Sequence, residues 1–365
     1  MIYLIAGNGA PNFGDELIVA NWLRYYREMG YNGPLVVDGK GARATEQLLR
    51  GYGDVRFVKG IPRHAEGVEG SYTDFYSLGV DFAIQQLHEF QGIKGIHCLG
   101  GGYASANWNN ATKLLGSAAE IGRLLDIPVV ATGLGISPFN LCEEADRTTW
   151  QRILNSFRIF ECRDAESYTD LLSLVGREVN SLTLGLDDAF LYPVKAQRHS
   201  GKWLHLSGFT AKIFNSDSSE AFEKLMGEFD NTAFWSCSKP DQLVYEELLK
   251  LYPDIQLLDN ERLLNNGLPL MQADFMITGR FHPHMQAARR GLHGYYIAES
   301  GFYRTKHGLV AELGSPFKQL EKSLEFFDSP NSLMSGFDRG RVESKRRVGF
   351  QILRLFDIET HAVAD

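Results

Sequence analysis

Short apolar runs alternate with longer segments of helical period through most of the chain. In the first half, the strand-like runs are IYLIA, LVVD, VRFV, GIHCL, PVVATG and RIFEC. Between them, segments such as 16–29, 107–125 and 166–175 repeat apolar residues every three or four positions, which predicts amphipathic helices. Strands that alternate with helices in this way predict a parallel, doubly wound α/β sheet.

A second series of the same kind follows, with the runs WLHLSG, TAFWSC, IQLLD, DFMITG and GYYIA and helical periods at 241–251 and 284–290. Between the two series, the polar stretch YPVKAQRHSGK at 192–202 has the composition of a linker. We therefore predict a first domain over 1–195, a second over 203–320, and a C-terminal helical segment over 321–365 that packs back on the first domain. A cleft between two such domains is the expected place for a site.

Composition narrows the class of protein. The chain has 365 residues, of which 44% are apolar, and this is enough for two hydrophobic cores. A net charge of -8 argues against nonspecific binding of nucleic acid, because such a binder needs a basic face to displace counterions from phosphates. The four cysteines form no C-x-x-C pair, and we see neither a signal-peptide pattern nor an apolar run of membrane-spanning length. We expect reduced thiols in a cytoplasmic protein.

The stretch RGRVESKRRVGFQILR at 339–354 interleaves basic and apolar residues. This pattern occurs in helices that lie on anionic lipid, so a peripheral association with the inner face of the membrane is one interpretation. A solvated helix that packs on a neighbouring part of the protein is the interpretation that we favour.

The loop GNGAPNFGDE follows the first strand-like run, where a dinucleotide-binding domain carries G-x-G-x-x-G. Here the third glycine, Gly14, comes two residues late, Pro11 removes one amide, and Asp15 and Glu16 would repel a phosphate at the helix start. Asp15 and Glu16 either cap the helix or serve as a general base or a ligand of sugar hydroxyls. Asn12, in the same loop, is a candidate substrate contact.

A second glycine cluster, LGGGYASANWNN at 99–110, follows the run GIHCL. Gly101 and Gly102 would let the backbone approach a ligand closely, and Tyr103 and Trp108 offer aromatic faces of the kind that bind sugars. A tight turn from strand to helix is the alternative interpretation.

The segment DFMITGRFHPHMQAARRG at 274–291 is the strongest local signal. A buried strand ends before Arg280, Phe281 and His282, and Pro283 marks the start of a helix. A guanidinium, an imidazole and free helix amides at one point predict an anion site with a titratable group.

Two further cations could join such a site. Arg163 follows the run RIFEC and either binds an anion or pairs with Asp164, and Lys306 could add positive charge to the pocket of Arg280. His282 and His284 could form a metal pair, but no other ligand lies nearby in the sequence, so we expect no metal.

An ordered set of motifs carries a family resemblance: NFGDELI, GGG at 100–102, GLGISP, CRDAES, DDAFLYP, GRFH and YRTKHGLVAELG. From about residue 5 to residue 314, the chain resembles the polysaccharide pyruvyl transferase family. This resemblance implies two Rossmann-like domains that face a cleft, as in glycosyltransferases of the B type, with the acceptor side in the first domain and the donor side in the second. It also implies transfer of pyruvate from phosphoenolpyruvate onto two sugar hydroxyls as a cyclic ketal. The family's arginine-x-histidine donor motif falls on Arg280 and His282.

For that reaction we expect Arg280, Arg163 and Lys306 to hold phosphoenolpyruvate and His282 to act as the acid. Asp15 or Glu16 would serve as base or acceptor ligand. No cofactor is required, because fixed cations can neutralise the leaving phosphate. A B-type glycosyltransferase that uses a nucleotide sugar, and a noncatalytic protein for sugar binding or assembly, remain as alternatives.

Overall fold

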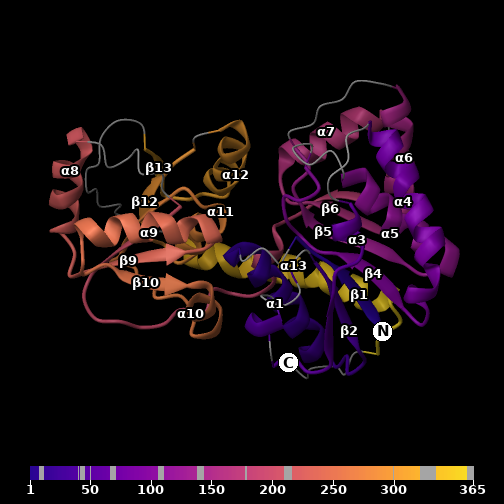
Figure 1. Ribbon diagram of the computed structural model, residues 1–365, viewed down its shortest axis with the longest axis horizontal. Coiled ribbons are helices and arrows are strands. Elements are labelled where there is room, and N and C mark those ends of the chain that lie inside the picture. Colours follow the sequence, from indigo (N-terminus) through magenta and orange to yellow (C-terminus); the bar gives the residue numbers. More distant parts are fainter. Residues whose placement is uncertain are drawn as a thin grey trace. The chain divides into compact units, whose positions relative to one another are not determined.

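The computed structural model describes residues 1–7, 12–39, 41, 46–49, 51–65, 71–105, 111–137, 144–176, 179–208, 216–298, 300–320 and 334–359. The chain divides into two compact units (Figure 1). The first unit comprises Met1–Gly9, Asp15–Leu191 and Val342–Asp365, and the second comprises Ala10–Gly14 and Tyr192–Arg341.

The first unit contains a seven-stranded parallel sheet in the order β3-β2-β1-β4-β5-β6-β7. Most of its strands are buried along their whole length, which explains why they appear in the sequence as continuous apolar runs. The strands are β1 (Ile2–Ile5), β2 (Leu35–Asp38), β3 (Val55–Val58), β4 (Gly95–Cys98), β5 (Val129–Leu134), β6 (Ile159–Cys162) and β7 (Leu182–Leu184).

Helices cover this sheet, and among them α4, α5 and α6 pack against one another. A capping box of Ser71 and Asp74 starts α4, and Asp164 caps α7. The helices are α1 (Phe13–Glu28), α3 (Ile61–His64), α4 (Tyr72–Gln86), η1 (Leu87–Phe90), α5 (Ala111–Leu125), α6 (Glu144–Ser156), α7 (Ala165–Val175) and η2 (Asp188–Leu191). The long helix α13 (Met334–Leu355) begins in the second unit and ends in the first.

The second unit contains a six-stranded parallel sheet in the order β10-β9-β8-β11-β12-β13. Its strands are β8 (Trp203–Ser207), β9 (Asn231–Ser236), β10 (Gln256–Asp259), β11 (Phe275–Thr278), β12 (His293–Tyr296) and β13 (Lys318–Gln319). Its helices are α8 (Ser216–Met226), α9 (Lys239–Leu251), α10 (Asn260–Asn265), α11 (Phe281–Arg289) and α12 (Gly301–Glu312). The prediction of two parallel α/β domains is therefore confirmed.

Both sheets share one strand order. Counted from its own first strand, the second sheet runs 3-2-1-4-5-6, and the first sheet runs in the same order with a seventh strand at its end, so the winding reverses between β1 and β4 in one unit and between β8 and β11 in the other. Ligands of such sheets bind at the carboxyl ends of the strands where the order reverses. The loops there begin after β1, β4, β8 and β11, and they carry the glycine-rich and GRFH motifs of the sequence.

A buried charge network ties the first unit together around Asp188. One carboxylate oxygen, Oδ2, accepts hydrogen bonds from Gly100 N (2.7 Å), Trp22 Nε1 (2.8 Å) and Thr132 Oγ1 (2.8 Å). The other, Oδ1, lies 2.6 Å from Lys345 Nζ of α13, which also contacts Glu161. Burial alone lowers the pKa of Lys345, but Asp188 and Glu161 outweigh burial and raise it, so the ammonium stays charged.

The last turns of α13 pack on the first unit by one face. Lys345, Ile352 and Leu353 are buried, whereas Arg347 and Phe350 are exposed. Over the part of the chain that the structure describes, no helix combines the length and apolar composition needed to cross a bilayer. Cys98, Cys162 and Cys237 are buried free thiols.

Removal of the Lys345 ammonium should destabilise the first unit strongly. Lys345→Ala leaves Asp188 and Glu161 as buried carboxylates without their cation, which costs about 3 to 5 kcal/mol for a broken buried pair. Chemical denaturation, followed through the transition of the first unit, measures this loss. The exposed Arg347 on the same helix provides the control, since Arg347→Ala should change stability by less than about 0.5 kcal/mol. Equal losses from the two variants would contradict this account of the network.

Candidate functional site

The end of the opening loop belongs structurally to the second unit. Asn12 forms an antiparallel bridge with Ser238, and the Phe13 amide donates to the carbonyl of Cys237 at 2.8 Å. The Phe13 ring also meets Trp235 edge to face, with a centroid distance of 6.1 Å. These contacts hold residues 12–14 against the carboxyl end of β9.

Gly14 packs directly against the imidazole of His282. A Cβ atom at position 14 would lie 1.7 Å from His282 Nδ1, so a side chain there would displace the ring. His282 is the second residue of α11 and is 8% exposed, and its neighbour Phe281 is 5% exposed. The glycine that comes too late for a dinucleotide fingerprint therefore makes room for a histidine.

Arg280 precedes α11 and is held by α9. Its Nη2 donates to Ser238 Oγ at 2.7 Å and to the carboxylate of Asp241, which also accepts from the amides of Cys237 and Ser238. Gly208, at a φ of +62°, leaves room for the Arg280 side chain, because a Cβ there would lie 2.5 Å from Arg280 Cγ. Burial alone lowers the pKa of Arg280, but Asp241 reverses the shift and raises it, so the guanidinium is always charged.

Two side chains of α12 extend this positive site. Tyr303 lies close enough to Arg280 to interact with it electrostatically. Lys306 Nζ lies 5.8 Å from the centre of the Tyr303 ring. In the second unit, Arg280 and His282 thus follow the carboxyl end of β11, and Tyr303 of α12 interacts with Arg280 and has Lys306 near its ring.

Two buried histidines lie behind this site. His284 Nδ1 is 2.9 Å from His307 Nδ1, and His284 Nε2 is 2.8 Å from Ser315 Oγ, which accepts from the Phe317 amide. Between the two Nδ1 atoms one ring donates and the other accepts, and the Ser315 hydroxyl can serve as donor or acceptor for His284 Nε2. Burial lowers the pKa of His284 well below its ordinary value and that of His307 to about 4. Both rings are therefore neutral at neutral pH, and they position α11 against α12.

In the first unit the structure brings Asp15 close to the second glycine cluster. Asp15 Oδ1 lies 3.7 Å from where a Cβ of Gly101 would stand, and the Tyr103 ring covers Gly101. Gly101 has a φ of +145°, a conformation that favours glycine. The Tyr103 hydroxyl donates to the Leu99 carbonyl at 2.5 Å. Gly102 is part of the same turn, whereas the predicted contact Trp108 lies outside the described residues.

Glu16 and Arg163 are enclosed by the first unit. Glu16 has no exposed surface, whereas Asp15 is partly exposed. Arg163 is 4% exposed, and its Nη1 binds Asp187 at 3.0 Å, while Asp164 lies at 3.9 Å. This geometry supports the interpretation of Arg163 as an ion-pair residue, and Asp187 is its main partner.

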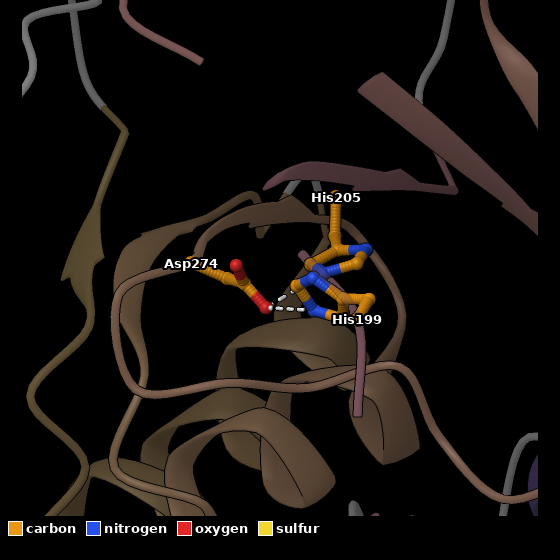
Figure 2. A group of neighbouring side chains, drawn as sticks. All are labelled: His199, His205 and Asp274. Carbon is orange, nitrogen blue, oxygen red and sulfur yellow. Dashed lines mark hydrogen bonds and ion pairs between the residues drawn. The ribbon is translucent and has the colours of Figure 1, made fainter. Parts of the chain in front are cut away.

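One group of side chains in the second unit has the composition of a metal site: His199, His205 and Asp274 (Figure 2). Asp274 Oδ2 lies 2.8 Å from His199 Nε2 and 3.4 Å from His205 Nε2. However, Trp235 Nε1 donates to His205 Nδ1 at 3.2 Å, so the proton of a neutral His205 ring must be on Nε2. A nitrogen that carries this proton cannot bind a metal ion. The amides of Met271 and Trp203 also donate to Asp274, which makes the group a structural anchor for β8 and β11.

The fold defines a protein of two Rossmann-like domains, and Asp15, Arg280 and His282 lie in or just after the loops at the strand-order reversals. The model of the family "polysaccharide pyruvyl transferase" matches residues 12–265, and the chain belongs to this family. The match agrees with the motifs that carry the resemblance in the sequence. A search of curated proteins gives no match.

Solved structures share the fold at low identity. A putative UDP-N-acetylglucosamine 2-epimerase from Listeria monocytogenes is 11% identical, with 98% of this chain and 96% of that chain covered and a TM-score of 0.58. The S. aureus MnaA-UDP co-structure is 11% identical, with coverage of 100% and 99% and a TM-score of 0.60. UDP-GlcNAc 2-epimerase from Methanocaldococcus jannaschii is 12% identical, with coverage of 97% and 99% and a TM-score of 0.55. At these identities the likeness shows the fold alone.

Several residues that surround Arg280 were missed in the sequence. Ser238 and Asp241 have the S-x-x-D spacing of a capping box, and the structure contains that box at the start of α9. Their second role, as partners of Arg280, depends on the pairing of strands far apart in the chain. Tyr303 and Gly208 carry no local signal of their contacts with Arg280.

The neutral His307 should make the second unit sensitive to acid. Its pKa falls from 6.5 to about 4 on folding, so the unfolded chain binds a proton in this window that the folded chain does not. The free energy of unfolding should therefore fall as the pH drops from 6.5 to 4, with about 3 kcal/mol from this group. Denaturation at several pH values should show a weaker pH dependence for His307→Gln. His88→Gln, at an exposed position, should keep the wild-type dependence, and an unchanged slope in His307→Gln would contradict the prediction.

Proposed function

We propose that this protein transfers pyruvate from phosphoenolpyruvate onto two hydroxyls of a saccharide, as a cyclic ketal, and releases phosphate. The family membership supports a pyruvyltransferase. One observation supports the assignment of phosphoenolpyruvate binding to Arg280 and His282. Arg280 and His282 stand two residues apart at the start of α11, each with a glycine that leaves it room. An arginine fixed by a carboxylate beside an imidazole suits a donor that carries both charge and a site for protonation.

The second unit supplies the cations that phosphoenolpyruvate needs. Ser238 and Asp241 both accept from Nη2 of Arg280, and the buried Nε has no partner among the described residues. The guanidinium therefore keeps donors for a phosphate or carboxylate. We assign Lys306 to the second anionic group of the donor and Phe281, at the first position of α11, to the wall of the site.

His282 is our candidate for the general acid. It gives a proton to the methylene carbon of phosphoenolpyruvate, which becomes a methyl group and leaves C2 electrophilic. One sugar hydroxyl adds to C2 and gives its proton to Asp15, and the C2–O bond to phosphate breaks with its electron pair going to the phosphate. Asp15 then releases that proton to solvent, and His282 takes one back from solvent. The second hydroxyl adds to C2 and closes the ketal, and its proton leaves with the phosphate. Donor and diol together thus give ketal and inorganic phosphate without a redox step.

The acceptor is assigned to the first unit, with Asp15 as the base. Asp15 is partly exposed and lies near the turn of Gly101, Gly102 and Tyr103, whereas Glu16 is fully enclosed. The aromatic face and open backbone of that turn suit a saccharide. Asn12 accepts from the Gly14 amide and so shapes the loop that leads to Asp15. We assign Arg163 a structural role in the first unit, because its guanidinium already binds Asp187.

Calorimetry with two ligands tests this function against its nearest rival. Phosphoenolpyruvate should bind, and UDP should not, if the donor is phosphoenolpyruvate. A glycosyltransferase that uses a nucleotide sugar would show the reverse. Release of phosphate from phosphoenolpyruvate on addition of a saccharide acceptor then excludes a noncatalytic sugar-binding protein.

Arg280→Lys should weaken the binding of phosphoenolpyruvate by roughly 1 to 3 kcal/mol, the worth of a charge-assisted hydrogen bond. Lysine keeps the charge but loses the planar fork that can bind Asp241 and the donor together. Calorimetry measures the change directly. Arg304→Lys, at an exposed position of α12, is the matched control and should bind like the wild type. Equal affinity in Arg280→Lys would move the donor site elsewhere.

His282→Gln should lower turnover by about 10² to 10⁴ while the affinity for phosphoenolpyruvate changes little, because glutamine can hydrogen-bond but cannot shuttle a proton. Steady-state phosphate release and calorimetry separate the two effects. Gly14→Ala tests the role of His282 without replacing it, because the added methyl group must displace the His282 ring. It should also lower turnover. Near-normal turnover in His282→Gln would make that residue structural, and the general acid would have to be another residue.

A further inference from the structure

The first unit holds a cavity of about 430 Å³. Its lining comes from β1, the end of β3, α3, and the last turns of α4 with η1. The residues assigned above to donor and acceptor do not line it. The volume is in the range of pockets that bind small organic molecules.

Aromatic side chains form the walls of this cavity. Tyr3 and Phe90 pack with ring centroids 5.1 Å apart, and His64 stacks on Phe82 at 4.2 Å with an interplanar angle of 22°. These faces offer an apolar interior to a ring or a hydrocarbon chain.

The buried Asp38 fixes the shape of the cavity. It has no exposed surface and accepts from Gly60 N (2.6 Å), Ile61 N (2.7 Å) and the Tyr3 hydroxyl (2.7 Å). A Cβ at Gly60 would lie 2.9 Å from both Asp38 Oδ2 and the Tyr3 hydroxyl, so the loop after β3 closes tightly over this carboxylate. Asp38 stands where a dinucleotide-binding domain has its ribose ligand, but here its carboxylate is enclosed and holds the lining residues Tyr3 and Gly60.

The rim of the cavity is cationic. Arg56, Lys59 and Arg63 line it, and none of these exposed side chains makes a hydrogen bond or ion pair with a described residue. Glu89 is the acidic residue of the lining, and it contacts His88 at 3.2 Å. In a chain of net charge -8, three cations around one aromatic pocket form a local positive field that suits an anion.

We propose that this cavity binds a phosphate monoester whose organic part carries a flat ring or a hydrocarbon chain. The phosphate lies among Arg56, Lys59 and Arg63, and the organic part lies between the aromatic walls. A nucleoside monophosphate and an isoprenoid monophosphate share this chemistry. The site is separate from the pyruvyl transfer proposed above and does not depend on it.

Calorimetry with three probes tests the site: farnesyl monophosphate, uridine monophosphate and inorganic phosphate. At least one ester should bind at least tenfold more tightly than inorganic phosphate, and the better ester identifies the kind of organic part. Arg56→Gln with Arg63→Gln should weaken that ester by tenfold or more, as expected for the loss of charge-assisted hydrogen bonds. Phe82→Leu should weaken the ester but not inorganic phosphate.

Arg152→Gln is the matched control, because Arg152 is exposed on α6 of the same unit and does not line the cavity. It should bind the ester like the wild type. The double arginine variant should keep its affinity for phosphoenolpyruvate, which separates this site from the donor site. The proposal is overturned if neither ester binds more tightly than inorganic phosphate, or if the double variant binds the ester as well as Arg152→Gln does.

Discussion

The contact between Lys345 and Asp188 is the constraint on which the first unit depends. Asp188 is fully buried and holds the amide of Gly100 at the start of the glycine-rich turn, the indole of Trp22 in α1 and the hydroxyl of Thr132 in β5. A carboxylate with so many donors is stable inside a protein only when its charge is balanced, and Lys345 from α13 supplies that balance. The C-terminal helix thus sets the position of a turn encoded far upstream.

In the second unit, two glycines provide the space that the side chains of His282 and Arg280 occupy. Gly14 leaves the space that the His282 ring fills, and Gly208 does the same for Arg280. Each of the two side chains then has a fixed direction, because interior packing tolerates few alternatives once the space is filled. Asp241 completes the arrangement: it holds its own loop through two amides and Arg280 through one guanidinium nitrogen, so the arginine is ordered before any ligand arrives. Such preorganisation is what an anion site needs.

The strands could be predicted closely, because a parallel strand buried on both faces must be a continuous apolar run. β7 and β13 were missed, since Leu184, Lys318 and Gln319 are exposed and leave no such run. Arg280 and His282 stood out because strand, turn and helix start are contiguous there. The contact of Gly14 with His282 could not be predicted, because it joins segments far apart in the chain. For Asp241, the local capping pattern was complete in itself and gave no sign of a distant arginine.

The motifs of the family therefore divide into two physical kinds. Arg163 and the pair Asp187 and Asp188 form ion pairs and hydrogen bonds inside the first unit, which makes them part of the scaffold of the glycine-rich turn. Residues 12–14 and the segment from Arg280 to His282 instead meet at strand ends where the sheet order reverses. A buried charge must keep its partner, so motifs of the first kind are fixed by stability whatever the substrate. In the second kind, Arg280 Nε is buried without a hydrogen-bond partner among the described residues, which leaves a donor for a ligand.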